Sequence, residues 1–167
     1  FYTAKNALEK QTNEYTNILK GMNVVFIHME SMQTFLMDLE FNNQEVVPNV
    51  NKLASEGMFF ENFYPQASVG TSSDTEFTLT TSLMPANSGT VFVSYYNRTY
   101  ISIPKLLKEQ GYFTFSMHGN KADMWNRSKM HPQLGYDEMY FQDSFDVTEE
   151  NTVGLGISDY AFFEQAM

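Results

Sequence analysis

Acidic, hydroxyl and imidazole side chains follow three apolar runs of the sequence, each at the point where a run ends. They are Glu30, a cluster of hydroxyl groups within 68–74, and His118. A hydroxyl at a helix N-terminus faces partial positive charge and free backbone N–H groups, which favour its alkoxide and a bound phosphate. A divalent cation held by Glu30 would favour the alkoxide further and neutralise phosphoryl oxygens. Together these residues predict a site that attacks phosphate esters through a covalent Ser or Thr phosphoester.

Each of these residues also has an ordinary structural explanation. A glutamate just after a buried strand is commonly a surface-loop residue, and Ser or Thr at a helix start commonly caps the helix. His118 suits a hydrogen-bonded strand end, and Trp125 suits a core anchor. Residue type and position alone therefore leave both interpretations open, and the catalytic one rests on the joint occurrence of these groups at strand ends.

Two further candidates lack a pattern that indicates chemistry. His131 is followed by Pro132 and has no acidic or histidine partner at ligand spacing, so we interpret it as a structural or surface residue. The acidic run 143–150 lacks the alternating ligands and central glycine of an EF-hand, so we interpret it as a solvated loop.

The elements that must position these groups alternate between apolar runs and helix-compatible segments, with a loop or small ribbon at 84–100. The expected strands are 22–28, 58–64, 112–117 and 137–141, and the expected helices are 47–56, about 73–83, 104–110, 121–130 and one beginning at Asp159 with Ser158 as its cap. This alternation predicts an α/β fold with a mainly parallel sheet and helices on both faces. In such sheets, ligands bind beyond the carboxyl ends of the strands.

Composition limits the class of protein and its partners. The chain has 167 residues, 43% of them hydrophobic, which is enough for one substantial core. We expect a polar, helical lead-in segment at 1–20 and a single domain at 21–167. A net charge of −10 argues against nucleic acid as a partner. The abrupt ends of the sequence suggest a piece of a longer polypeptide.

Three stretches, VPNVNKLASEGMFFENFY (47–64), GTSSDTEF (70–77) and HGNKADMWNR (118–127), resemble blocks of the lipoteichoic acid synthase family, which belongs to the sulfatase and alkaline-phosphatase superfamily. The stretch VPNVNKLASEGMFFENFY (47–64) is similar to the segment after the first metal ligand of the superfamily. GTSSDTEF (70–77) resembles the family's nucleophile turn, G-x-T-S-D-x-E-F, and HGNKADMWNR (118–127) resembles its block H-G-x(5)-W-N-R. The likeness runs from about Asn23 to the C-terminus and implies a truncated alkaline-phosphatase or sulfatase-like fold.

The resemblance implies a role for each matching residue. Glu30 falls on the first metal ligand, and Ser72 falls on the nucleophile, which in the family also touches the metal. The family nucleophile is normally Thr, so Thr71 is an alternative, although that shift breaks the alignment of the residues that follow. The positions that face the glycerol-phosphate group are His118, Trp125 and Arg127.

The activity implied by the resemblance is transfer of glycerol phosphate from phosphatidylglycerol to lipoteichoic acid, usually with Mn²⁺, with Mg²⁺ or Zn²⁺ as alternatives. The enzyme would act on the outer face of the cell membrane of a Gram-positive-type bacterium, held by an N-terminal anchor outside this sequence. Primases, phosphodiesterases, sulfatases and degenerate domains that bind anionic polymer are the alternatives. The sequence has no C/S-x-P-x-R motif of true sulfatases.

The resemblance also implies that further metal ligands, an Asp-His pair, lie downstream of this sequence. Glu30 and Ser72 supply only two oxygen ligands, whereas a catalytic Mn²⁺ or Zn²⁺ site needs at least three protein ligands. We therefore expect the chain alone to bind metal weakly and to be inactive. We also expect self-association through an exposed edge of the truncated sheet.

Overall fold

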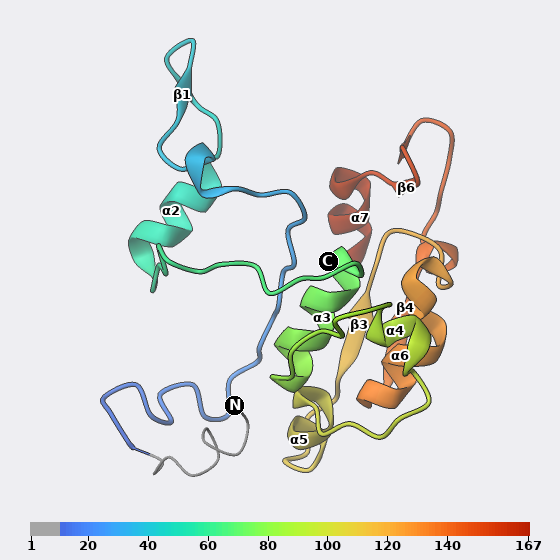
Figure 1. Ribbon diagram of the computed structural model, residues 1–167. Helices are drawn as coiled ribbons and strands as arrows, with labels where there is room; N and C mark the ends of the chain where they lie inside the picture. The colour runs from blue at the N-terminus through green and yellow to red at the C-terminus, as the bar shows by residue number, and fades with distance from the viewer. Residues whose placement is uncertain (1–10) are drawn as a thin grey trace.

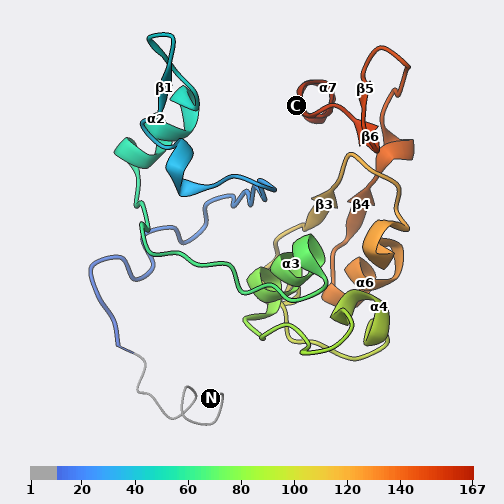
Figure 2. The same cartoon turned by 45° about the horizontal axis from the view of Figure 1, so that its top comes forward.

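The computed structural model describes residues 11–167, which form an extended N-terminal arm (11–69) and a C-terminal body (70–167), as Figure 1 shows. The arm carries one α-helix, one short 3-10 helix and one small hairpin. The body holds the remaining helices and the parallel pair of strands. Figure 2 shows that the arm and the body lie side by side, joined by the linker that leads into α3 (Thr71–Thr81).

The start of the arm is a series of turns rather than the helix expected there. The backbone N–H of Thr16 donates to Asn13 O at 3.0 Å, and that of Met22 donates to Leu19 O at 3.1 Å, both in the i to i−3 pattern of turns. Residues 11–20 are all exposed, so no packed apolar face offsets the cost of starting a helix. The rest of the expected helical segment, 1–10, lies outside the described residues.

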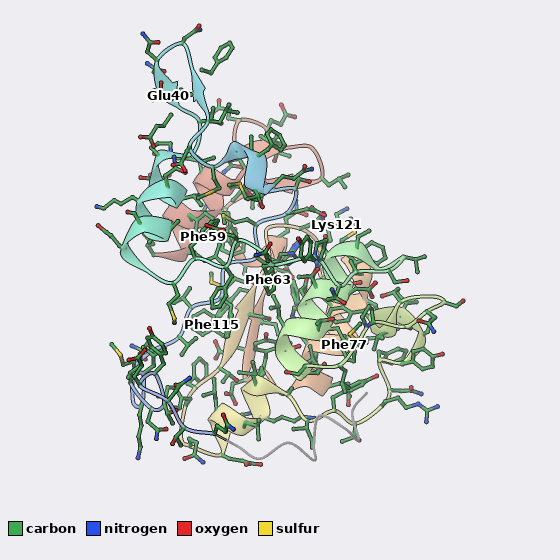
Figure 3. The ribbon with its side chains drawn as sticks, turned by 60° about the vertical axis from the view of Figure 1, so that its left-hand side comes forward. Glu40, Phe59, Phe63, Phe77, Phe115 and Lys121 are labelled. Atoms are coloured by element: carbon green, nitrogen blue, oxygen red, sulfur yellow. The ribbon has the colours of Figure 1, made fainter. Side chains whose placement is uncertain are left out.

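The middle of the arm contains the elements η1 (Thr34–Leu36), β1 (Glu40–Phe41), β2 (Gln44–Glu45) and α2 (Pro48–Glu56). The two strands form an antiparallel hairpin whose connecting residues, Asn42 and Asn43, have φ of 51° and 60°. Such left-handed pairs suit a tight hairpin turn. Glu40 lies on this hairpin, away from the body (Figure 3). Helix α2 confirms the expected helix 47–56, with Pro48 in its first turn and Gly57 just past its end.

The strands expected at 22–28 and 58–64 do not form; both segments are irregular and exposed. Val25 is 81% exposed and Phe60 is 68% exposed. An apolar run becomes a buried strand only where a neighbouring strand receives its hydrogen bonds and other elements cover its faces. Within the described chain, neither segment pairs with a strand. Figure 3 shows Phe59 and Phe63 on the linker that leads from the arm into the body.

The body begins with helices and continues through a parallel pair of strands. Its first elements are α3 (Thr71–Thr81), α4 (Val91–Ser94), α5 (Ile103–Lys108), β3 (Phe115–Met117), η2 (Met124–Asn126), α6 (Arg127–Leu134) and β4 (Glu138–Tyr140). Strands β3 and β4 are parallel, with Phe115 opposite Glu138. They confirm the expected strands 112–117 and 137–141 in shorter form. Helices α3 and α5 confirm the helices expected at about 73–83 and at 104–110.

The core of the body lies between α3, α4 and α6. Its buried side chains are Phe77, Val91, Phe92, Met130 and Leu134. Phe77 lies inside the body in Figure 3. Two of the five core residues come from α4, so the expectation that 84–100 is only loop or ribbon is wrong. The reason is burial, because an apolar pair at the start of a short turn of helix anchors that segment to α3.

The C-terminal end of the body contains η3 (Gln142–Ser144), β5 (Thr152–Val153), β6 (Gly156–Ile157) and α7 (Asp159–Ala166). Ser158 caps α7 by accepting a hydrogen bond from the backbone N–H of Ala161 at 3.3 Å, which confirms the expected cap. The acidic residues of 143–150 are exposed, as expected for a solvated loop. Over residues 11–167, no helix has the length and apolarity that crossing a membrane requires.

Replacement of Phe92 by alanine is expected to lower the free energy of unfolding of the body by about 3–5 kcal/mol, because the side chain is completely buried. Urea denaturation followed by circular dichroism measures the change. Phe41→Ala is the matched control, since that ring is 72% exposed and its removal should cost less than about 0.5 kcal/mol. Equal losses in the two variants would contradict this core assignment.

Candidate active site

Ser72 and Glu30 meet where the arm crosses the start of α3. The Ser72 hydroxyl donates to Glu30 Oε1 at 2.5 Å, across 42 residues of sequence. Ser72 lies in the first turn of α3, where backbone N–H groups are free and the helix dipole is positive. The structure thus brings together the two residues expected to hold metal and places the hydroxyl at a helix N-terminus.

Buried polar groups hold the turn that precedes Ser72. Asp74 Oδ2 accepts hydrogen bonds from the backbone N–H groups of Ser68 at 2.8 Å and Gly70 at 3.0 Å. Ser73 Oγ donates to Gly70 O at 2.7 Å and lies 3.0 Å from Thr90 Oγ1. A Cβ at Gly70 would lie 2.4 Å from Asp74 Oδ1, so this close approach requires glycine. The turn is therefore fixed by the buried side chains of Asp74 and Ser73.

The residue before Ser72 has an unusual backbone conformation. Thr71 has φ of 43°, in the left-handed region that a β-branched residue rarely adopts. Backbone strain of this kind is found where surrounding contacts hold a functional turn in place. The hydroxyl that reaches Glu30 belongs to Ser72, the residue that follows Thr71.

His118 directly follows β3 and has a defined ring orientation. Its Nδ1 accepts a hydrogen bond from the backbone N–H of Asn120 at 3.0 Å. Burial, above all, lowers the pKa of His118 to about 4; the positive charge of Arg127 adds to this, while the charges of Glu76 and Glu30 oppose it. The ring is therefore neutral at pH 7 and carries its proton on Nε2, as a hydrogen-bond donor.

Trp125 lies within η2, at a strained turn directly before α6. Trp125 and Asn126 are both left-handed, with φ of 54° and 58°. The Asn126 side chain holds the turn by donating to Phe92 O at 2.7 Å. Trp125 is half-buried and packs against the core of the body. Trp125 therefore anchors this turn to the core, one of the two roles that residue type alone left open, and its side chain remains partly exposed.

Arg127 is almost completely buried, at 1% exposure, and is paired with a residue that sequence reasoning did not single out. Its Nε donates to Glu76 Oε1 at 3.0 Å and Oε2 at 3.1 Å, and its Nη2 also donates to Glu76 Oε1. Its Nη1 donates to Met124 O at 3.1 Å. The only signal for Glu76 in the sequence is its place in the GTSSDTEF stretch.

Glu76 also binds His131, which is a structural residue as expected. His131 Nε2 donates to Glu76 Oε2 at 3.1 Å, and its Nδ1 lies 2.8 Å from Ser116 Oγ. Burial tends to raise the pKa of Glu76, but hydrogen bonds from His131 and Arg127 and the charge of Arg127 outweigh it and lower the pKa to about 2. Glu76 is therefore ionised across the physiological range.

The donor set at Ser72 and Glu30 consists of oxygen atoms, which suit Mn²⁺ and Mg²⁺ and are accepted by Zn²⁺. Among the residues that the structure describes, no cluster of three or more His, Cys, Asp and Glu side chains is placed to hold a metal ion. The described residues thus fit part of a divalent-cation site, a carboxylate and a hydroxyl already in contact.

Comparison with known sequences gives a consistent set of relatives. A family model described as Sulfatase matches residues 22–167. Lipoteichoic acid synthase 2 of Bacillus subtilis (strain 168) is 38% identical over 157 residues, covering 93% of this chain and 24% of that protein. Lipoteichoic acid synthase of Staphylococcus aureus (strain USA300) is 37% identical over 169 residues, covering 99% of this chain and 26% of that protein. The chain spans about a quarter of the length of these relatives.

Comparison with solved structures shows the fold. The crystal structure of a lipoteichoic acid synthase from Listeria monocytogenes matches with a TM-score of 0.75 and 29% identity over 79% of this chain and 32% of that chain. A protein of the alkaline phosphatase superfamily from Vibrio parahaemolyticus matches with a TM-score of 0.61 and 27% identity over 71% of this chain and 29% of that chain. The expected alkaline-phosphatase-like α/β fold is confirmed, in truncated form.

Acid should remove the contribution of Glu76 to stability over a defined range of pH. Its pKa falls from an ordinary value of 4.5 to about 2 on folding, so its contribution is complete above pH 4.5 and is lost as the pH falls toward 2. Urea denaturation midpoints measured across this range should fall less steeply for Glu76→Gln than for the unchanged chain. Glu56→Gln, at an exposed helix end, is the control, and its urea midpoint should fall with pH as steeply as that of the unchanged chain. If the midpoint falls equally steeply with pH in all three proteins, Glu76 does not make this contribution to stability.

Proposed function

The chain belongs to the sulfatase family, and from this premise we propose that it carries the nucleophile and the first metal ligand of an enzyme that transfers glycerol phosphate. The observation that carries the proposal is the contact between the Ser72 hydroxyl and Glu30 at the N-terminus of α3. The relatives named lipoteichoic acid synthase support a glycerol-phosphate polymer as the product.

In the proposed reaction, the Ser72 oxygen attacks the phosphorus of phosphatidylglycerol. The new bond joins Ser72 Oγ to phosphorus, the bond between phosphorus and the diacylglycerol oxygen breaks, and that oxygen takes up a proton as diacylglycerol leaves. The hydroxyl proton leaves along its hydrogen bond to Glu30 Oε1. In the second step, the terminal hydroxyl oxygen of a growing lipoteichoic acid chain bonds to phosphorus and gives up its proton. The bond from phosphorus to Ser72 Oγ breaks, and Ser72 Oγ takes up a proton to become a hydroxyl again. The first turn of α3 favours both the alkoxide and the phosphoryl oxygens.

Glu30 and Ser72 would hold the divalent cation, Mn²⁺ in this proposal, with Mg²⁺ or Zn²⁺ as alternatives. A cation bound there would favour the ionised form of the Ser72 hydroxyl and would neutralise charge on the phosphoryl oxygens. The two residues supply a carboxylate oxygen and a hydroxyl oxygen from different parts of the chain, the arm and α3. Their preformed contact means that little reorganisation is needed to present both donors to one ion.

His118, Trp125 and Arg127 form the proposed pocket for the glycerol-phosphate group. The neutral His118 ring offers its Nε2–H as a donor to a phosphate or glycerol oxygen. Arg127 brings a guanidinium held by Glu76, and Trp125 offers the accessible part of its ring as an apolar wall. The proposed location is the outer face of the cell membrane of a Gram-positive-type bacterium, where phosphatidylglycerol and the polymer meet.

Ser72→Ala in the full-length protein that contains this chain is expected to lower transfer from phosphatidylglycerol by at least about 1,000-fold, because the attacking oxygen is lost. Release of diacylglycerol from lipid vesicles measures the rate. Ser55→Ala, on the exposed face of α2, is the matched control and should keep full activity. Unchanged transfer by Ser72→Ala together with loss in Thr71→Ala would assign the nucleophile to Thr71. Unchanged transfer in both would favour a binding domain.

The isolated chain is expected to bind Mn²⁺ weakly, because Glu30 and Ser72 provide two donors where a stable site needs at least three. Titration calorimetry of the chain with Mn²⁺ tests this, with Glu30→Gln as the variant that should remove the remaining weak signal. Tight binding of one Mn²⁺ per chain would contradict the prediction and would mean that further ligands come from within it.

A further inference from the structure

Glu76 joins the nucleophile helix to the proposed substrate pocket. It lies four residues after Ser72 on α3, and positions at that spacing share one face of a helix. Its carboxylate takes the paired hydrogen bonds of Arg127, the first residue of α6. The helix that presents the proposed nucleophile therefore also holds the arginine of the proposed pocket.

The pairing fixes the direction of the guanidinium. A guanidinium has five N–H donors in one plane. Glu76 occupies the edge formed by Nε and Nη2, and Met124 O takes a donor of Nη1. The remaining N–H of Nη2 therefore points away from Glu76, along the end of the side chain. A bidentate pair of this kind sets geometry as well as attraction.

The carboxylate is itself held from a second side. His131 of α6 donates to Glu76 Oε2, and Ser116 of β3 lies against the other ring nitrogen of that histidine. Glu76 thus cannot rotate away without breaking its hydrogen bonds to both Arg127 and His131 of α6. Ser72 and Glu76 lie four residues apart on one face of α3, which places the ion pair on the same side of that helix as the proposed nucleophile.

Stability alone is a weak explanation for this arrangement. Burial of an ion pair costs desolvation of both charges, and apolar residues of similar size often stabilise as well or better. An arrangement in which one carboxylate orients an arginine and is oriented by a histidine resembles the outer shell of a functional site, where partners fix the direction of a group that contacts the ligand.

We propose that Glu76 is a positioning residue that orients Arg127 toward the phosphate group attacked by Ser72, with His131 and Ser116 holding the Glu76 carboxylate in place. This inference rests on the function proposed above, because it assumes that Arg127 meets the transferred glycerol-phosphate group.

The test uses the full-length protein with phosphatidylglycerol vesicles and Mn²⁺, and determines kcat and KM for Glu76→Asp and Glu76→Gln. Glu76→Asp keeps the charge but withdraws the carboxylate by one methylene, so it is expected to fold and to lower kcat by about 10- to 100-fold. The melting temperature of each variant is measured beside its rate. Glu56→Gln serves as the control for loss of a glutamate charge on an exposed helix.

A double-mutant comparison separates positioning from a merely structural role. If Glu76 acts through Arg127, Glu76→Gln in an Arg127→Gln background should change kcat by less than about 2-fold, because the group that it orients is already gone. Lower melting temperatures with unchanged kcat and KM in the Glu76 variants would overturn the inference. The inference would also be overturned if the losses of kcat in the Glu76 and Arg127 single variants multiplied in the double variant.

Failure of the proposed function looks different in the same assay. Transfer that survives in both Ser72→Ala and Thr71→Ala would overturn both the proposed function and this inference. An inactive Ser72→Ala beside Glu76→Asp at the unchanged rate would overturn only the role of Glu76. If Glu76→Gln does not fold, Glu76→Asp and Ser116→Ala carry the test, and wild-type rates in both would contradict the positioning role.

Discussion

The buried ion pair between Glu76 and Arg127 is the interaction on which the C-terminal body depends. Arg127 is 1% exposed and starts α6, while Glu76 lies in the middle of α3, so the pair crosses the core between two helices. A charge left unpaired at such a depth is strongly destabilising, whereas the matched pair roughly offsets its own desolvation. The packing of Phe77 and Met130 beside it supplies the net stabilisation, and the ion pair decides how the helices are set against each other.

The candidate site is divided between a well-packed part and a loosely packed part. Ser72 belongs to a turn held by buried side chains, Asp74 and Ser73, which are both completely buried. Glu30 belongs to the exposed arm, and its contact with Ser72 joins the arm to the body. The position of the hydroxyl is therefore set by the fold of the body, while the position of the carboxylate depends largely on the hydroxyl that it contacts.

Local signals predicted the bounds of α2 and the cap of α7 well, and the longer-range features less well. Pro48 and Gly57 bounded α2, and Ser158 capped α7, because these effects depend on residues within one turn. The runs 22–28 and 58–64 carry a strand pattern, but a strand also needs a neighbour, which no local pattern can guarantee. The GTSSDTEF stretch located Ser72, whereas the partners of Glu76 lie 51 and 55 residues away and left no trace in spacing. His131 was correctly interpreted as structural, but its contact with the Glu76 carboxylate, 55 residues away in sequence, is visible only in the structure.

The charges of the described groups explain why the proposed chemistry needs a cation at Ser72 and Glu30. His118 is neutral at pH 7 and contributes a hydrogen bond without charge. Arg127 is positive, but Glu76 is ionised beside it and cancels most of its field. Glu30 adds a further negative charge next to the attacking oxygen. A phosphoryl group that approaches Ser72 would therefore meet oriented donors and a helix N-terminus but little net positive charge. The proposed chemistry therefore needs positive charge most beside the Glu30 carboxylate and the Ser72 hydroxyl, the two groups proposed as ligands of the cation.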